Sequence, residues 1–143
     1  YGKLKVEAER VLLNESRSIS LRLATVFGTS PRKRLDLLVN DLVCKAVNDG
    51  YVVLFESHFK RNYVHIRDVV MAFIHCLNKF EEMEGGAYNV GLSNANLSKW
   101  ELCEEIKKAL PKFYFTEAPL REDPDKRNYI VSNKKIEQTG FKA

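Results

Sequence analysis

The sequence predicts an α/β fold, in which helices and strands alternate along the chain. In some stretches apolar residues recur at every third or fourth position, which is typical of a helix. In others they recur at every second position, which is typical of a strand. Glycine, proline and other turn-forming residues separate these stretches. Regular alternation of the two element types is the pattern of the α/β class.

The first half of the chain is predicted to contain two helices and three strands. Leu4 and Ala8 begin a helical repeat at the start of the chain. Further on, Ile19, Leu21 and Leu23 alternate with polar residues, so we expect them to face one side of a strand. The five elements are helices over residues 1–14 and 35–47 and strands over residues 18–26, 52–55 and 62–65.

A strongly apolar helix from Asp68 to Phe80 opens the second half. Because its side chains are apolar almost all round, we expect this helix to be buried. Ser98 and Glu101 form a capping-box pattern at the start of a further helix, which Pro111 ends. The other predicted elements are strands over residues 87–90, 113–116 and 129–131, a polar loop over residues 120–127, and a short helix from residue 132 to residue 140.

The composition is that of an ordinary globular chain of one domain, or of a piece of a larger one. Hydrophobic residues make up 45% of the 143 residues and charged residues 29%, which is enough for a real core. The net charge of +4 suits an anionic ligand, but it also suits a protein without one. The sequence has neither a membrane-spanning apolar stretch nor a signal peptide. We therefore expect a cytoplasmic location and no membrane partner.

The cysteines and histidines do not have the spacing of metal ligands. The three cysteines are far apart and form no CxxC motif, so we expect buried free thiols in a reducing compartment. The histidines are equally scattered, and no metal site is predicted. These residues are Cys44, Cys76, Cys103, His58, His65 and His75.

Tyr1 and Lys5 have the spacing of a catalytic pair. Residues four apart lie on one face of a helix, so their polar heads can share a site. A lysine ammonium lowers the pKa of a nearby phenol from its free value of about 10. Such a tyrosine can exchange a proton with a sugar hydroxyl while a nicotinamide exchanges hydride. With 6 tyrosines in the chain, an ordinary exposed pair is the alternative interpretation.

Four segments of the chain carry a resemblance to a known family. They read YGKLKVEAE, LRLATVFGTSP, RNYVHIRDVVMAFIHCL and GGAYNVGLSNANLS. Their order and spacing resemble the extended short-chain dehydrogenase/reductase family, in which YxxxK is followed by LRxxxxYG, RxYxHVxDVAxA and YNVG. The resemblance implies the C-terminal half of an NAD-dependent nucleotide-sugar epimerase or dehydratase. The chain also begins directly within a helical pattern and without methionine, which we expect of a piece of a longer protein.

The resemblance implies a single partial domain over residues 1–143. It consists of the C-terminal part of a Rossmann-type NAD(P)-binding fold plus a small substrate-binding α/β subdomain. Residues 1–30 and 62–91 belong to the first part, and residues 31–61 and 92–143 to the second. The family's GxxGxxG loop and the serine or threonine before its tyrosine do not occur in this sequence. NAD or NADP is therefore expected in the complete enzyme, whereas this chain alone is expected neither to bind NAD well nor to turn over.

The resemblance assigns the catalytic and cofactor-binding roles to four residues. Tyr1 matches the catalytic tyrosine, and Lys5 matches the lysine that supports it and holds the nicotinamide ribose. Thr25 and Val26 follow a strand that ends at the nicotinamide and the sugar. Many family members carry a longer asparagine where Thr25 stands. His65 is interpreted as a structural residue of a strand-to-helix turn.

The resemblance assigns substrate contacts to Thr25 and to five further residues. Arg61 and Arg127 each match an arginine that grips the substrate diphosphate, and two guanidinium forks suit one pyrophosphate. Arg32 and Arg34 lie in the loop that meets the substrate, and Asn40 lies near the nucleotide base. A surface salt bridge is the alternative interpretation of Arg61 and Arg127, and a solvated basic loop is that of Arg32 and Arg34.

The expected partner is a nucleotide diphosphate sugar. Epimerase, 4,6-dehydratase, decarboxylase and reductase activities all remain open, because each involves hydride transfer at a sugar carbon. The competing hypothesis is a non-catalytic α/β module that binds a nucleotide or RNA. Aromatic residues are not interleaved with arginines, so no nucleic-acid partner is predicted. Many family members are dimers, and a fragment leaves strand edges uncovered, so we expect a homo-oligomer formed by self-association.

Overall fold

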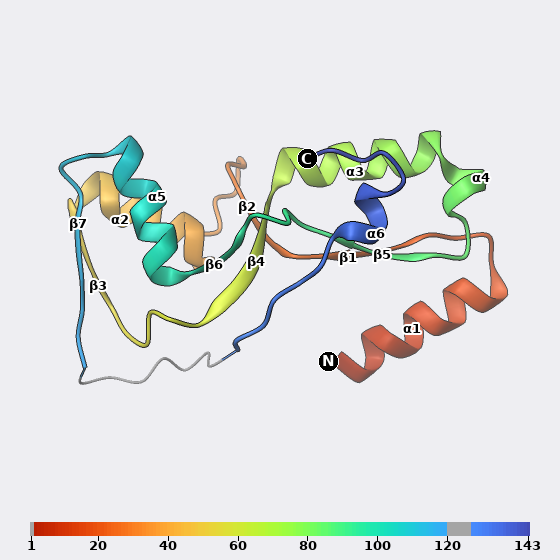
Figure 1. Ribbon diagram of the computed structural model, residues 1–143, viewed down its shortest axis with the longest axis horizontal. Coiled ribbons are helices and arrows are strands. Elements are labelled where there is room, and N and C mark those ends of the chain that lie inside the picture. Colours follow the sequence, from red (N-terminus) through yellow and green to blue (C-terminus); the bar gives the residue numbers. More distant parts are fainter. Residues whose placement is uncertain (1, 120–126) are drawn as a thin grey trace.

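The computed structural model describes residues 2–119 and 127–143, in which helices and strands alternate as predicted (Figure 1). The helices are α1 (Gly2–Glu15), α2 (Leu38–Asn48), α3 (Ile66–Asn78), α4 (Phe80–Met83), α5 (Lys99–Ala109) and α6 (Lys134–Glu137). The strands are β1 (Ser20–Leu23), β2 (Thr25–Phe27), β3 (Tyr51–Leu54), β4 (Lys60–His65), β5 (Ala87–Val90), β6 (Asn96–Ser98) and β7 (Tyr114–Glu117). The α/β class is confirmed.

The strands of the described residues pair mainly in parallel, in three small sheets. β1 pairs with β5, with Ser20 opposite Ala87, and β3 pairs with β7 in the same parallel sense. β2 pairs in parallel with β4, which pairs on its other side with the antiparallel β6. Each parallel pair needs a crossover connection of a dozen or more residues, which explains why helices separate the paired strands.

The predicted strand over residues 18–26 is interrupted at Ala24. Before this residue the chain pairs with β5, and after it the chain pairs with β4. The change of partner shifts the alternation, so Ala24 and Val26 pack into the core while Leu23 is 43% exposed. Leu23 is therefore not buried as the alternation with Ile19 and Leu21 would suggest.

Buried side chains form two clusters at opposite ends of the molecule. One cluster lies among α2, α5, β3 and β7, and the other among α3, α6, β1 and β5, with β2, β4 and β6 between them (Figure 1). Ile136 and Phe141, from the last residues of the chain, are buried in the second cluster. The C-terminal residues thus complete the core around the first and fifth strands.

Helix α3 is buried on one face only, contrary to the prediction. Its buried residues are Val69, Ala72 and Cys76. Five large apolar side chains on its other positions are 44–73% exposed, because this face meets no neighbour among the described residues. They are Val70, Met71, Phe73, Ile74 and Leu77.

Local capping patterns were predicted well, and one short strand was not. Ser98 and Glu101 form both hydrogen bonds of the capping box at the start of α5. The predicted strand over residues 129–131 does not form. Instead Val131 N–H donates to the side chain of Asn96, in β6, a strand that the sequence did not predict.

Candidate functional site

The carboxyl ends of β2 and β4 lie side by side and open onto a cavity. Phe27 and His65, the last residues of these parallel strands, are in register. A cavity of about 500 Å³ lies between these ends, the loop after β2 and one face of α2. Ligands of open α/β sheets bind outside the carboxyl ends of the strands. The lining residues are Phe27, Gly28, Thr29, Lys33, Leu35, Val39, Asn40, Val43, Cys44, Val47, Asn48 and His65.

Asn40 holds the loop that borders this cavity. Its Oδ1 accepts a hydrogen bond from Gly28 N–H at 3.1 Å, and its Nδ2 donates to the carbonyl of Arg34 at 3.0 Å. Because one amide joins both ends of the loop, Asn40 fixes the course of the chain around Arg32. Asn40, which was predicted to lie near the nucleotide base, thus also has a structural role in this loop.

Arg34 forms a bidentate ion pair with Asp36 within the same loop. Its Nε and Nη2 lie 2.7 Å and 2.6 Å from the two carboxylate oxygens. The Arg34 hydrogen bonds hold the pKa of Asp36 at about 2, well below its usual value. Lys33, which lies between Arg32 and Arg34 in the sequence, lines the cavity. It was not predicted as a site residue.

His65 supports the turn from β4 into α3, as predicted. Its Nδ1 accepts the hydrogen bond of Arg67 N–H at 3.2 Å and so caps the helix. The ring also meets Phe27 edge-on, with the two centroids 5.3 Å apart. Gly28 has a φ of +130°, and a Cβ there would lie 2.8 Å from His65 Nε2. Glycine is therefore required where the end of β2 passes the histidine ring.

The chain segments that carry Arg61 and Arg127 lie side by side. Arg61 is only 8% exposed on the central strand β4. The preceding residue, Lys60, donates its N–H to the Asn128 side chain and accepts from Tyr129 N–H, both at 3.0 Å. Arg127 directly precedes Asn128, so the structure brings together the two segments predicted to bind diphosphate. Thr25 lies on the neighbouring strand β2, opposite Tyr63, which follows Arg61 by two residues on β4.

The predicted catalytic helix α1 lies on the opposite face of β1 from α3 and α6 (Figure 1). Tyr1 lies outside the described residues, so the structure gives no geometry for the Tyr1–Lys5 pair. Lys5 is exposed on α1. The helix is joined to β1 by Glu9, whose carboxylate accepts hydrogen bonds from Ser20 Oγ at 2.5 Å and from Arg22 Nε at 2.9 Å.

The hydrogen bonds of Glu9 were not predicted from the sequence. Arg22 and Ser20 lower the pKa of the Glu9 carboxyl to about 2, so the group is ionised at neutral pH. One signal was available: Glu9 follows Lys5 by four residues and so lies on the same face of the helix.

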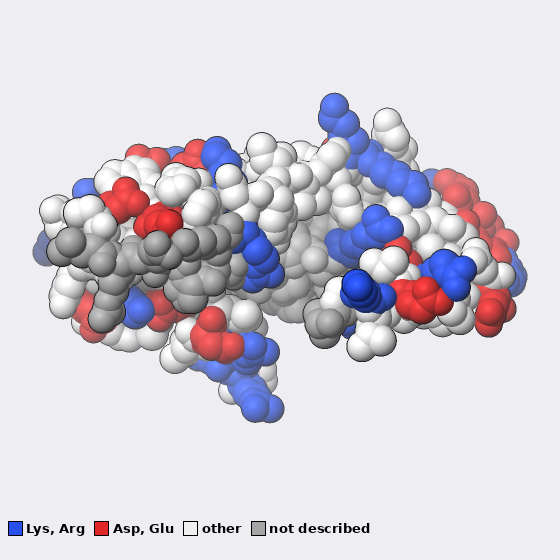
Figure 2. All heavy atoms as spheres, turned by 90° about the horizontal axis from the view of Figure 1, so that it is seen from below, with Lys and Arg blue, Asp and Glu red and all other residues white. Residues whose placement is uncertain are grey.

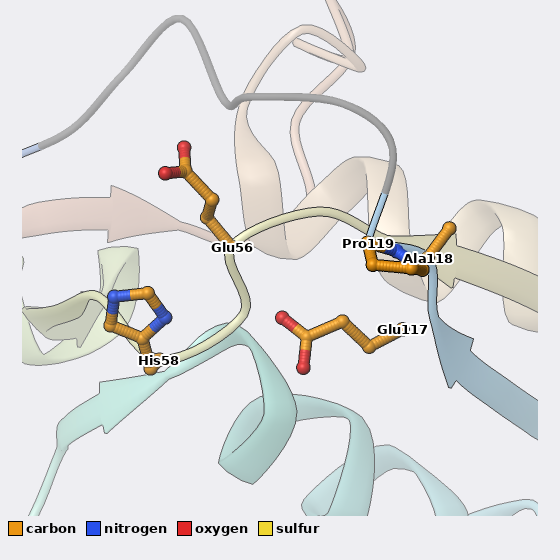
Figure 3. A pocket seen from close by; sticks show the side chains of 5 residues that line it. All are labelled: Glu56, His58, Glu117, Ala118 and Pro119. Carbon is orange, nitrogen blue, oxygen red and sulfur yellow. The ribbon is translucent and has the colours of Figure 1, made fainter.

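A second cavity, of about 370 Å³, lies where the turn after β3 approaches the end of β7 (Figure 3). Glu117 points toward the turn that carries Glu56 and His58, and its carboxylate accepts Ser57 N–H at 2.8 Å. This hydrogen bond is the main cause of the lowered pKa of Glu117, with His58 and Lys99 adding to it. Among the described residues no group of His, Cys, Asp or Glu side chains could hold a metal ion.

Two of the three cysteines, Cys76 and Cys103, are buried. Burial raises the pKa of Cys76, and raises that of Cys103 to about 11, which keeps both thiols protonated. Figure 2 shows basic and acidic side chains interspersed over one face of the molecule. No helix in the described ranges, 2–119 and 127–143, is long and apolar enough to cross a membrane.

Comparison with known proteins places these features in a family. The model of the NAD dependent epimerase/dehydratase family matches residues 1–91. A curated relative, the probable UDP-arabinose 4-epimerase 1 of Oryza sativa subsp. japonica, is 29% identical over 135 residues. That match covers 76% of this chain and 32% of the rice protein, so the chain spans about a third of its relative.

Two solved structures share the fold. The UDP-glucose 4-epimerase of Thermotoga maritima with UDP-glucose superposes with a TM-score of 0.78 and 22% identity, covering 99% of this chain and 47% of that one. The dTDP-glucose 4,6-dehydratase of Bacillus anthracis in complex with NAD gives a TM-score of 0.64 and 22% identity, covering 85% and 38%. These likenesses confirm the predicted Rossmann-type class.

Proposed function

Because the chain belongs to the NAD dependent epimerase/dehydratase family, we propose that it is the C-terminal part of an enzyme acting on a nucleotide diphosphate sugar. The observation that supports this proposal is that the chain segments carrying Arg61 and Arg127 lie side by side, next to β2. The complete enzyme works by hydride transfer, with a Tyr/Lys acid–base pair. Epimerisation, dehydration, decarboxylation and reduction of the sugar all fall within this proposal.

In the proposed mechanism Tyr1 exchanges the proton of a sugar hydroxyl. Lys5, one helical turn along, stabilises the phenolate and holds the nicotinamide ribose. NAD or NADP, when bound, supplies the hydride acceptor and donor. Thr25 and Val26 border the nicotinamide and the sugar, which is supported by their place near the carboxyl end of a parallel strand pair.

The substrate diphosphate lies, in this proposal, between Arg61 and Arg127. A guanidinium donates two parallel hydrogen bonds to phosphate oxygens, and two such groups from different segments can grip a pyrophosphate from both sides. The Thr25 hydroxyl, and Arg32 and Arg34 in the loop after β2, add contacts to the same ligand. Asn40 lies toward the nucleotide base.

Removal of the Arg61 fork is expected to weaken binding of UDP-glucose to the chain by about 10- to 100-fold. The loss corresponds to hydrogen bonds to a charged group, about 1.5–3 kcal/mol. Isothermal titration of Arg61→Ala and Arg61→Lys measures it, and Lys retains the charge but loses the fork. Arg10→Ala is the control, because Arg10 is exposed on α1 and pairs only locally, with Glu7. Parent-like affinity of a folded Arg61→Ala chain would contradict the proposal.

The isolated 143-residue chain is expected to bind NAD only weakly. The pyrophosphate of NAD needs the glycine-rich turn and helix N-terminus of the family, and this sequence has no GxxGxxG. Isothermal titration with NAD checks this expectation, with UDP-glucose as the positive control. A micromolar dissociation constant for NAD would show the expectation to be wrong.

The remaining proposals concern location and assembly. We propose a cytoplasmic location and self-association, and the exposed apolar side chains of α1 and α3 support the latter. A non-catalytic module that binds a nucleotide or RNA is the competing hypothesis. The interspersed charges of Figure 2 offer RNA no continuous basic surface on the face shown.

A further inference from the structure

Glu9 is the most enclosed acidic group in the junction between α1 and β1. Its side chain is 16% exposed, whereas that of its partner Arg22 is 58% exposed. Three hydrogen bonds end on its carboxylate: from Ser20 Oγ at 2.5 Å, from Arg22 Nε at 2.9 Å and from Arg22 Nη2 at 2.5 Å. Hydrogen bonds between charged groups are about twice as strong as neutral ones.

Apolar packing contributes little to the placement of α1. None of its residues is buried, and Leu4, Val6 and Leu12 are largely exposed. Ser20 and Arg22 project from the face of β1 opposite to Leu21, which packs into the core. The polar contacts of Glu9 therefore have a large share in holding the helix to that face of the sheet.

The contacts also fix the direction and level of the helix along the strand. Leu12 carbonyl accepts from Ser18 Oγ, and Glu9 reaches Ser20 and Arg22, so α1 and β1 run antiparallel (Figure 1). Toward its N-terminus the helix rises about 6 Å from Glu9 to Lys5. A strand advances about 3.3 Å per residue. Lys5, on the same face of the helix as Glu9, then falls level with Leu23.

We propose that Glu9 is a positioning residue, which clamps α1 to β1 and so places Lys5, and with it the helix that carries the proposed catalytic pair, beside the end of β1. The inference rests on the proposed function, because it is the Tyr/Lys pair that is positioned. In this role Glu9 acts through the placement of its helix, by its hydrogen bonds to Ser20 and Arg22. The low pKa of Glu9 supports the role, because the charged clamp is complete throughout the neutral range.

The test compares Glu9→Gln with Glu7→Gln. Both substitutions remove one carboxylate from α1, but Glu7 pairs with Arg10 on the same helix and not with the sheet. In the 143-residue chain, hydrogen exchange of the α1 amides is expected to accelerate for Glu9→Gln only. In the complete enzyme, Glu9→Gln is expected to lower kcat by about 10- to 100-fold, because small misplacements of catalytic groups cost that much.

The split between kcat and KM separates positioning from general damage. KM for the nucleotide sugar is expected to stay within about twofold, since Arg61 and Arg127 bind the diphosphate away from α1, and Glu9→Asp is expected to recover part of kcat. If the complete parent enzyme is active and its Glu9→Gln variant keeps the parent's kcat, the inference is wrong, even if the α1 amides exchange faster. The proposed function is not affected by that result. A complete protein without activity on any nucleotide sugar overturns the proposed function, and the inference with it.

Discussion

Replacement of Tyr1 by phenylalanine is expected to lower kcat of the complete enzyme by about 10²- to 10⁴-fold. General acid–base catalysis by a positioned side chain contributes an effect of this size. The substitution removes one hydroxyl and leaves the ring, so the helix and the arginines that we propose for the diphosphate stay in place. The KM for the nucleotide sugar is therefore expected to change little. Steady-state kinetics with a nucleotide sugar and bound NAD measure both constants.

Two further variants make this result specific. Lys5→Met is expected to lower kcat as well, because the phenol then keeps a pKa near about 10 and is a poor base at neutral pH. Tyr114→Phe is the control, since Tyr114 is an exposed tyrosine on β7, away from the helix. If Tyr1→Phe keeps the parent's kcat, Tyr1 is not the acid–base group and the proposed mechanism fails.

Replacement of Gly91 by alanine is expected to destabilise the chain by about 2–5 kcal/mol. A Cβ at Gly91 would overlap the amide oxygen of Asn62 and lie 3.0 Å from the Cβ of Ala24. Asn62 is fully buried and its Nδ2 donates to Leu92 carbonyl at 2.7 Å, so it can move only by giving up a buried hydrogen bond. Overpacking and an unsatisfied buried polar group each cost about 1–3 kcal/mol.

Urea unfolding followed by circular dichroism measures this loss as a shift of the midpoint. Gly50→Ala is the matched control. No atom lies within 4 Å of a Cβ at Gly50, but its φ is +77°, so the substitution costs only the strain of a left-handed backbone, about 1–2 kcal/mol. A Gly91→Ala midpoint no lower than that of Gly50→Ala would show that the crowding around Asn62 costs no more than the backbone strain at Gly50, which contradicts the prediction.

Elements specified by neighbouring residues could be predicted from the sequence. The capping box of Ser98 and Glu101 spans four residues, and its pattern alone located the start of α5. The cap at His65 is equally local. Their energetics depend on atoms close along the chain, so a single sequence contains the needed information.

Features that depend on distant partners could not be predicted. β6 has only three residues, and it is a strand because β4 lies beside it. The interruption at Ala24 arises because the chain changes from one strand partner to another. The exposed face of α3 was missed for the opposite reason, since apolar periodicity shows that a face can be buried but not that a neighbour is present.

The candidate site likewise contains features that the sequence predicted and features that depend on distant partners. Arg61 and Arg127 were assigned by family resemblance, and the contacts of Lys60 with Asn128 and Tyr129, nearly 70 residues apart, bring their segments together. The clamp of Glu9 on Arg22 joins residues 13 apart on different elements. The cavity beside Glu117 needs Ser57, from the turn after β3. No pattern of neighbouring residues specifies such contacts between distant segments.

The burial of Ile136 and Phe141 beside β1 and β5 has a consequence for biosynthesis. A ribosome makes a chain from its N-terminus, and domains begin to fold as they emerge. Until these residues have been made, the layer around β1 lacks the core side chains of Ile136 and Phe141. Asn62 also lacks the hydrogen bond that the Asn133 side chain donates to it. Synthesis as far as residue 130 therefore leaves β1 without part of its core, and this end of the molecule can reach its final packing only after translation of residue 141.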